Sequence, residues 1–238
     1  MVSTPKITCR LRILFLVGGS MILRIVFLIL FLGVSCLHLV DCWNNNDRRF
    51  LTKPLLMILL ILFYLFTAEY YLVPLIAGLI LSFFGDVFLM KAGDRWLLAG
   101  GCCFTGAHIS YILLFLGRLD PSSFILPVII VVPIIYGLIA LFVIFKIRSS
   151  TQKAMAIGLY IYLLINAAMN VLSLMHLLVY QTGSAALGYI GAILFFLSDC
   201  ILFLAIYTPE KVRFHPHFLV MSTYITAQFL ITMAMILA

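Results

Sequence analysis

Long apolar segments alternate with short polar ones along nearly the whole chain. A helix that spans a hydrocarbon core of about 30 Å needs roughly 20 consecutive, mostly apolar residues. The stretches between the apolar segments are short and leave no room for a soluble domain. The pattern predicts eight transmembrane helices, at about residues 22–41, 53–68, 72–90, 97–116, 124–145, 154–179, 184–207 and 216–237.

The composition is that of an integral membrane protein. Hydrophobic residues make up 65% of the chain, charged residues make up 10%, and the mean hydropathy is +1.24, well outside the range of soluble domains. Because the loops are short, helices adjacent in sequence should pack as antiparallel neighbours. We therefore expect an all-α bundle of about eight transmembrane helices in one polytopic domain, residues 21–238. Residues 1–20 are expected to be an N-terminal extension outside this fold.

The distribution of basic residues predicts the orientation, since Lys and Arg are enriched in short cytosolic loops. The loops after the second, fourth and sixth segments contain only Arg118. The loops after the first, third, fifth and seventh segments contain ten basic residues: Arg48, Arg49, Lys53, Lys91, Arg95, Lys146, Arg148, Lys153, Lys211 and Arg213. These loops should be cytosolic, with both termini on the opposite side of a bacterial inner membrane or a eukaryotic endomembrane. The net charge of +7 thus reflects topology and does not indicate nucleic-acid binding.

Two aspartates lie well inside apolar segments. Asp86 is within LSFFGDVFLM at 81–90, Asp199 is within FFLSDCILF at 195–203, and the other six acidic residues lie at segment ends or in loops. An aspartate at the centre of a transmembrane helix costs roughly 2.5–3.5 kcal/mol, so such residues usually face the bundle interior and are functional. The alternative is a structural role, in which each aspartate is a partner for Lys53, a tyrosine or a backbone group.

The two aspartates belong to a candidate internal repeat. They are 113 residues apart, and the same offset relates Gly78 to Gly191 and Tyr111 to Tyr224. A shift of four helices preserves chain direction, so two four-helix repeats would be related by an axis along the membrane normal. The two carboxylates would then lie at equivalent depths and face one central cavity.

Other polar residues fall at similar depths within the segments. Ser82 is four residues before Asp86, so the two residues share one face of their helix. Asn166 and Asn170 are also four residues apart and share a face of a later helix. Hydrogen bonds between helices are the default role for the two asparagines, whereas His108 could equally be a helix–helix hydrogen-bond donor or a catalytic group. The candidates for binding or positioning a substrate are Lys53, Ser82, His108, Tyr111, Tyr160, Asn170, Ser198, Tyr224 and Gln228. The chain contains no GxSxG, P-loop, HExxH or CxxC motif.

Five sequence stretches occur in the order found in a known family: TKPLL at 52–56, LSFFGDVFLM at 81–90, GAHISYILLF at 106–115, GAILFFLSDCIL at 191–202 and YITAQFLI at 224–231. From about residue 21 onward, the chain resembles the YhhN-type lysoplasmalogenase family of multi-pass membrane proteins. The resemblance implies hydrolysis of the vinyl-ether bond of a lysophospholipid within the bilayer. The products would be a fatty aldehyde and glycerophosphoethanolamine or glycerophosphocholine.

Two buried carboxyl groups suit this chemistry, which parallels glycoside hydrolysis. One carboxylic acid would protonate the alkenyl carbon, and a carboxylate would stabilise the resulting oxocarbenium ion or activate water. We therefore assign Asp86 and Asp199 as the acid/base pair, without a metal or cofactor, and leave open which is the acid. Tyr111, Tyr224 and Gln228 would position water or the ether oxygen, and Lys53 would meet the lipid phosphate.

Two other function classes remain open from sequence. A proton-coupled lipid or solute transporter would also use intramembrane carboxylates in repeated halves. A zinc-dependent intramembrane lipid hydrolase would combine His108, together with His38 or His176, with the aspartates.

Overall fold

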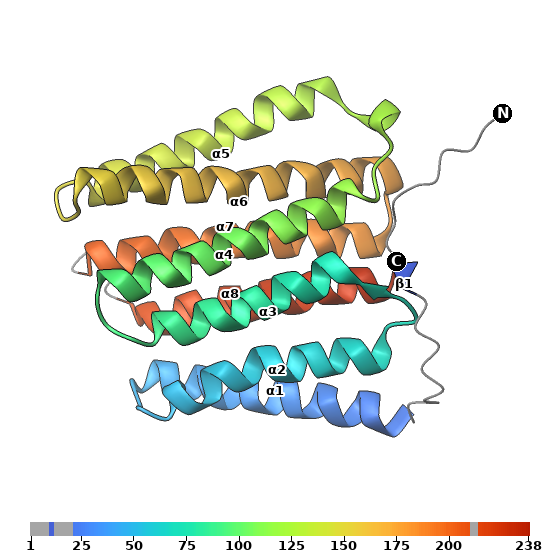
Figure 1. Ribbon diagram of the computed structural model, residues 1–238, viewed down its shortest axis with the longest axis horizontal. Helices are drawn as coiled ribbons and strands as arrows, with labels where there is room; N and C mark the ends of the chain where they lie inside the picture. Colours follow the sequence, from blue (N-terminus) through green and yellow to red (C-terminus); the bar gives the residue numbers. More distant parts are fainter. Residues whose placement is uncertain (1–9, 12–20, 210–213) are drawn as a thin grey trace.

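The computed structural model describes residues 10–11, 21–209 and 214–238, and most of them lie in α-helices (Figure 1). The helices are α1 (Met21–Trp43), α2 (Arg49–Thr67), α3 (Val73–Leu89), α4 (Asp94–Leu116), α5 (Leu126–Ile147), α6 (Lys153–Tyr180), α7 (Gly183–Tyr207) and α8 (Pro216–Ile236). A short 3-10 helix, η1 (Pro121–Ser123), precedes α5, and the two-residue strands β1 (Arg10–Leu11) and β2 (Tyr71–Leu72) pair antiparallel. Each segment expected from the sequence corresponds to one helix, so the predicted all-α bundle is confirmed. The remainder of the N-terminal extension lies outside the described residues.

Seven of the described helices are long and apolar enough to cross a membrane. The eighth, α3, has 17 residues, which at 1.5 Å per residue gives a helix about 26 Å long. The sequence suggested that the second segment, 53–68, would be the short one. Instead α2 has 19 residues, because it begins four residues earlier, in the basic segment at the membrane boundary.

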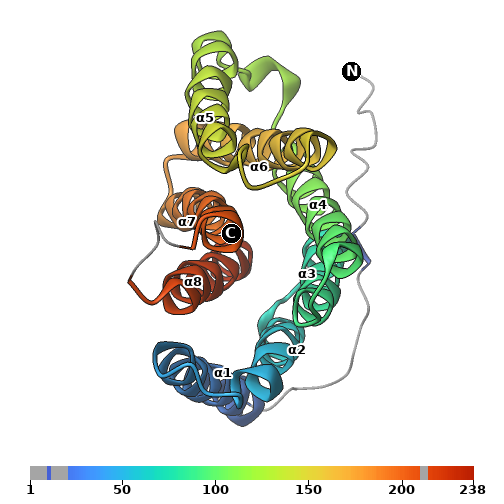
Figure 2. The same cartoon turned by 90° about the vertical axis from the view of Figure 1, so that its left-hand side faces the viewer.

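The helices form a curved wall around a central pair, as the end-on view shows (Figure 2). In that view α1, α2, α3, α4 and α6 follow one another along an arc, α7 and α8 lie on its concave side, and α5 lies beyond α6. The contacts between the halves include α4 on α6 and α8 on α2. Two four-helix repeats related by a twofold axis would make this pair of contacts, whereas among the described residues the α1–α8 contact has no α4–α5 counterpart of similar extent, so the repeat stays a hypothesis.

Glycines bring the two aspartate-bearing helices close to their neighbours. A Cβ atom at Gly78 of α3 would overlap the Tyr111 ring of α4, and one at Gly191 of α7 would approach Ala227 and Ile231 of α8. Small residues at such positions let transmembrane helices approach closely. The two glycines are 113 residues apart and each lies at the interface of its own hairpin, α3–α4 or α7–α8, although their neighbours are not equivalent residues.

The helices alternate in direction, so the loops after α1, α3 and α5 lie at one end of the bundle (Figure 1). Apart from Lys211 and Arg213, which lie outside the described residues, the ten basic residues of the predicted cytosolic loops belong to this end. Arg118 follows α4 at the opposite end. We call the first of these the basic end. The predicted charge asymmetry therefore separates the two ends of the bundle, and the assignment of the basic end to the cytosol stays a prediction.

Candidate functional site

A cavity of about 620 Å³ lies at the basic end of the bundle, among α1, α2, α3, α4, α7 and α8. Both intramembrane aspartates, Asp86 and Asp199, line this cavity. Its lining also includes the half-buried Arg49 and the exposed Lys91, so the cavity reaches the polar surface. The volume is within the range of small-molecule sites, and we call this space the site cavity.

Asp86 is held by an ion pair and a hydrogen bond. Its Oδ1 is 3.1 Å from the Lys53 Nζ of α2, and its Oδ2 accepts a 2.8 Å hydrogen bond from the Tyr224 hydroxyl of α8. The aspartate is 2% exposed, while the lysine side chain is 18% exposed. An adjacent ammonium stabilises the ionised form of a carboxyl group. Three helices thus meet at a paired carboxylate in the cavity wall.

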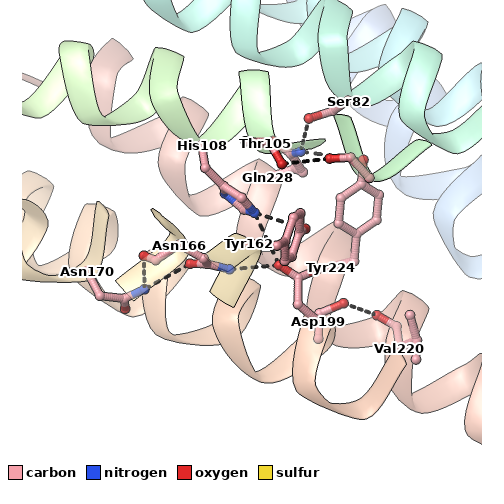
Figure 3. Close-up of polar contacts among 12 residues, drawn as sticks. Ser82, Thr105, His108, Tyr162, Asn166, Asn170, Asp199, Val220, Tyr224 and Gln228 are labelled. Carbon is pink, nitrogen blue, oxygen red and sulfur yellow. Dashed lines mark hydrogen bonds and ion pairs between the residues drawn. The ribbon is translucent and has the colours of Figure 1, made fainter. Parts of the chain in front are cut away.

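Asp199 has a different environment, in which one oxygen receives every hydrogen bond (Figure 3). Its Oδ2 accepts from the Tyr162 hydroxyl at 2.8 Å, from Asn166 Nδ2 at 2.7 Å and from His108 Nε2 at 3.2 Å. Within the described part of the chain, Oδ1 accepts no hydrogen bond. One oxygen is therefore fixed by the protein, and the other is available to a molecule in the cavity.

His108 acts on Asp199 as a hydrogen-bond donor from a buried, aromatic environment. Its Nε2 is also 3.0 Å from the Tyr162 hydroxyl, and its ring centroid is 4.6 Å from that of Phe195. Among the residues described, its Nδ1 has no hydrogen-bond partner. Because Nε2 lies within hydrogen-bond distance of the Asp199 carboxyl group and of the Tyr162 hydroxyl, an N–H donor at Nε2 fits this geometry.

A network of side-chain hydrogen bonds, from Tyr111, Gln228 and Ser82, holds the Tyr224 hydroxyl in place. The Tyr111 hydroxyl donates to Gln228 Oε1 at 2.6 Å, and Gln228 Nε2 lies 2.8 Å from Ser82 Oγ and 3.4 Å from the Tyr224 hydroxyl. Ser82 therefore pairs with Gln228 and not with Asp86, although it shares a helix face with the aspartate. This network fixes Tyr224, the tyrosine that donates a hydrogen bond to Asp86.

Two further predicted residues, Asn170 and Ser198, form hydrogen bonds with neighbours of Asp199 and not with the aspartate itself. Asn170 Nδ2 donates to Asn166 Oδ1 at 3.1 Å, and this orients the Asn166 amide so that its NH₂ group faces the aspartate. The hydroxyl of Tyr136 in turn donates to Asn170 Oδ1 at 3.0 Å. Ser198 lines the site cavity, and its hydroxyl donates to the carbonyl of Val220 at 3.1 Å, which joins α7 to α8.

One residue predicted from the sequence, Tyr160, lies apart from this cluster, and Tyr162 occupies the corresponding place. Two residues along an α-helix are about 200° apart around its axis, so these tyrosines lie on nearly opposite faces. Tyr162 is 7% exposed and contacts Asp199, whereas Tyr160 is half-buried and faces α5 near Gly137. Tyr162, Asn166 and Asn170 are spaced four apart. That spacing places all three on one face and would have identified the correct tyrosine.

The histidines of the zinc hypothesis are not gathered into one site. In the part of the chain that the structure describes, no three His, Cys, Asp or Glu side chains are arranged to hold a metal ion. His38 lies 2.7 Å from the Thr52 hydroxyl and 3.4 Å from Cys42 Sγ, and the His176 ring lies against those of Phe115 and Tyr180. The contacts of these residues thus give no support to a zinc centre.

Comparison with known proteins identifies one family. Residues 48–235, most of the chain, match the model of the YhhN family. The match begins just before α2 and leaves out α1, which the sequence resemblance was expected to include. No curated protein and no solved structure matches the chain.

Proposed function

The chain belongs to the YhhN family, and on this premise we propose that it hydrolyses the vinyl-ether bond of lysoplasmalogens. The products are a fatty aldehyde and the glycerophospho-base. The observation that carries the proposal is the pair of unlike carboxyl groups in one cavity: Asp86 is paired with a lysine, and Asp199 presents a free oxygen. Vinyl-ether hydrolysis needs one proton donor and one anion, and this pair supplies both.

Asp199 is the proposed general acid. Its Oδ1 transfers a proton to the β-carbon of the alkenyl group, and the π electron pair of the C=C bond forms the new C–H bond while the C–C σ bond stays intact. The positive charge that results is shared between the α-carbon and the ether oxygen as an oxocarbenium ion. Tyr162, Asn166 and His108 then stabilise the carboxylate that remains, through the three hydrogen bonds to Oδ2.

Asp86 is the proposed anion of the pair. Its carboxylate, kept ionised by Lys53, stabilises the oxocarbenium ion and accepts a proton from the water that adds to the α-carbon. The product of that addition is a hemiacetal. Its collapse breaks the C–O bond to glycerol, transfers the hydroxyl proton to the departing oxygen through the carboxyl groups and releases the aldehyde.

The phosphate of the substrate is assigned to Arg49 and Lys91, and this changes the role expected for Lys53. The Lys53 ammonium is engaged with Asp86, whereas Arg49 and Lys91 line the same cavity nearer the polar surface. An arginine binds phosphate well through its planar, multiple donors. The head group would therefore point toward the basic end of the bundle.

The function is tested by incubating purified protein in detergent with a 1-alkenyl lysophospholipid and measuring aldehyde. We expect aldehyde release that a chelator does not change, and no fatty acid from the matched 1-acyl lysophospholipid. Fatty acid from the acyl compound would show a different hydrolase. If no product forms and reconstituted protein moves the lipid in response to a pH gradient, the protein is a transporter.

A first prediction concerns the two tyrosines of α6. Tyr162→Phe removes one hydrogen bond to the Asp199 carboxylate, and hydrogen bonds to charged groups contribute about 1.5–3 kcal/mol. We expect aldehyde release to slow by roughly 10- to 100-fold. Tyr160→Phe, the matched control two residues away, should stay within about twofold of wild type. Equal effects of the two substitutions would contradict the assignment of Tyr162.

A further inference from the structure

A second cavity, of about 370 Å³, lies beside the site cavity, between α4, α6 and α7. We call it the α4–α6 groove. Its lining is almost entirely apolar, and it includes four residues that also line the site cavity: Leu89, Leu97, Phe104 and Leu202. The two spaces therefore adjoin one another along these shared side chains.

The groove extends to the outer surface of the bundle. The lining residues Leu98, Cys102, Ala154 and Gly158 are exposed, with Leu98 at 52%. They belong to α4 and α6, two neighbouring helices of the curved wall (Figure 2). Both helices are long and apolar enough to span a membrane, and in a bilayer this exposed surface would face lipid. The groove thus connects the bilayer with the candidate site from the side.

Two glycines of the groove are not required by helix packing. A Cβ atom at Gly101 of α4 or Gly158 of α6 would meet no atom within 4 Å. At the neighbouring Gly100, by contrast, a Cβ atom would come within 2.8 Å of the Leu89 side chain. Glycine inside a helix is unfavourable relative to alanine. Because close contacts do not explain these two glycines, their effect is to keep the groove wide.

We propose that the α4–α6 groove binds the hydrocarbon chain of the lysophospholipid substrate and admits it from the bilayer. The proposal deepens the proposed function and rests on it for the identity of the lipid. Tyr162 supports the arrangement, because its ring lines the groove while its hydroxyl contacts Asp199. A hydrocarbon chain lying in the groove would place the alkenyl-ether end of the lipid beside Asp199, the proposed general acid. The chain would stay in apolar surroundings throughout, which avoids the cost of exposing it to water.

The first test narrows the groove. Gly158→Leu places a side chain in the groove from α6, and Gly101→Leu places one from α4, each at a position where the added Cβ atom meets nothing within 4 Å. Gly33→Leu is the matched control, because a Cβ atom at Gly33 of α1 also meets nothing within 4 Å and the residue lines neither cavity. We expect the groove variants to lower kcat/KM for a hexadecenyl lysophospholipid by roughly tenfold or more and to spare a butenyl analogue. Gly33→Leu should leave both values unchanged.

The second test does not depend on hydrolysis. A lysophosphatidylethanolamine with a diazirine at the end of its acyl chain is photolysed with the protein, and the labelled peptides are mapped. Labels on α4 and α6 in both wild type and Asp199→Asn, much reduced in Gly158→Leu and Gly101→Leu, are the expected result. Labelling that is unchanged in the two groove variants, or that falls on other helices, would overturn the proposal. Labels in the groove without any aldehyde release would support the groove and refute the hydrolase.

Discussion

Replacing Asp199 by Asn is expected to lower aldehyde release from a 1-alkenyl lysophospholipid by about 10²- to 10⁴-fold, the usual contribution of a general acid. Asparagine has the same shape, and its carbonyl oxygen can accept the hydrogen bonds that Tyr162, Asn166 and His108 donate to Oδ2. Its NH₂ group would occupy the place of Oδ1 and cannot protonate a carbon atom. The variant should therefore fold normally, bind the lipid and fail in the chemical step.

The matched control for this variant is Asp41→Asn. Asp41 is also buried, at 7% exposed, but it accepts a 3.1 Å hydrogen bond from Asn46 and does not line the site cavity. Its substitution should change the rate by less than about threefold, because Asp41 does not line the site cavity and asparagine has nearly the same size. Rates are compared at saturating lipid, with thermal unfolding as the check on folding. Near-normal activity of a well-folded Asp199→Asn protein would remove this residue from the mechanism.

Hydropathy alone was enough to locate the helices of this chain, because each membrane-spanning segment must be long and apolar. It also identified Asp86 and Asp199, since a carboxyl group inside an apolar segment is costly and stands out. The offset of 113 residues related the two aspartates and their helices before any contact was known. The helices are confirmed because their prediction depends only on composition and length along single segments, whereas the repeat and the roles of the two aspartates stay predictions.

The sequence did not determine which side chains contact one another in the site. Those contacts depend on how each helix is rotated about its axis and on which helices it packs against. The choice between Tyr160 and Tyr162 follows from the face that α6 turns toward α7, and apolar residues surround both tyrosines. Lys53 was expected either at a phosphate or, in the structural alternative, beside an aspartate, and its side chain reaches inward to Asp86. Ser82 shares the aspartate's face but finds a partner in Gln228 on α8. Each of these contacts joins helices far apart in sequence.

The different surroundings of the two aspartates also arise from tertiary contacts. Asp86 and Asp199 are equivalent in the candidate repeat, and Tyr224, which donates to Asp86, is equivalent to Tyr111. Tyr111 donates its hydrogen bond to Gln228 and not to Asp199. Asp199 instead accepts hydrogen bonds from residues of α4 and α6. The two carboxyl groups are at equivalent positions of the candidate repeat, yet they have different hydrogen-bond partners. That difference supports the assignment of one as acid and the other as anion.

Removing both members of the Lys53–Asp86 ion pair is expected to restore the stability that either single substitution loses, but not the activity. Breaking a buried pair strands a charge at a cost of about 3–5 kcal/mol. Because the Lys53 side chain is 18% exposed, water screens the stranded charge and reduces this cost. We therefore expect Lys53→Met and Asp86→Asn each to lower the free energy of unfolding by roughly 1–3 kcal/mol. The double variant has no stranded charge and should recover most of that loss, which a double-mutant cycle in thermal unfolding would measure.

Activity should not recover with it. The double variant has no carboxylate at position 86, so the anion that stabilises the oxocarbenium ion is missing, and aldehyde release should stay about 10²-fold or more below wild type. Lys146→Met serves as the control, because Lys146 is exposed and lies over the Phe142 ring, away from the site cavity. A double variant that regains both stability and rate would show that Asp86 serves only to pair with Lys53. Stability that returns without activity would place the carboxylate in the reaction itself.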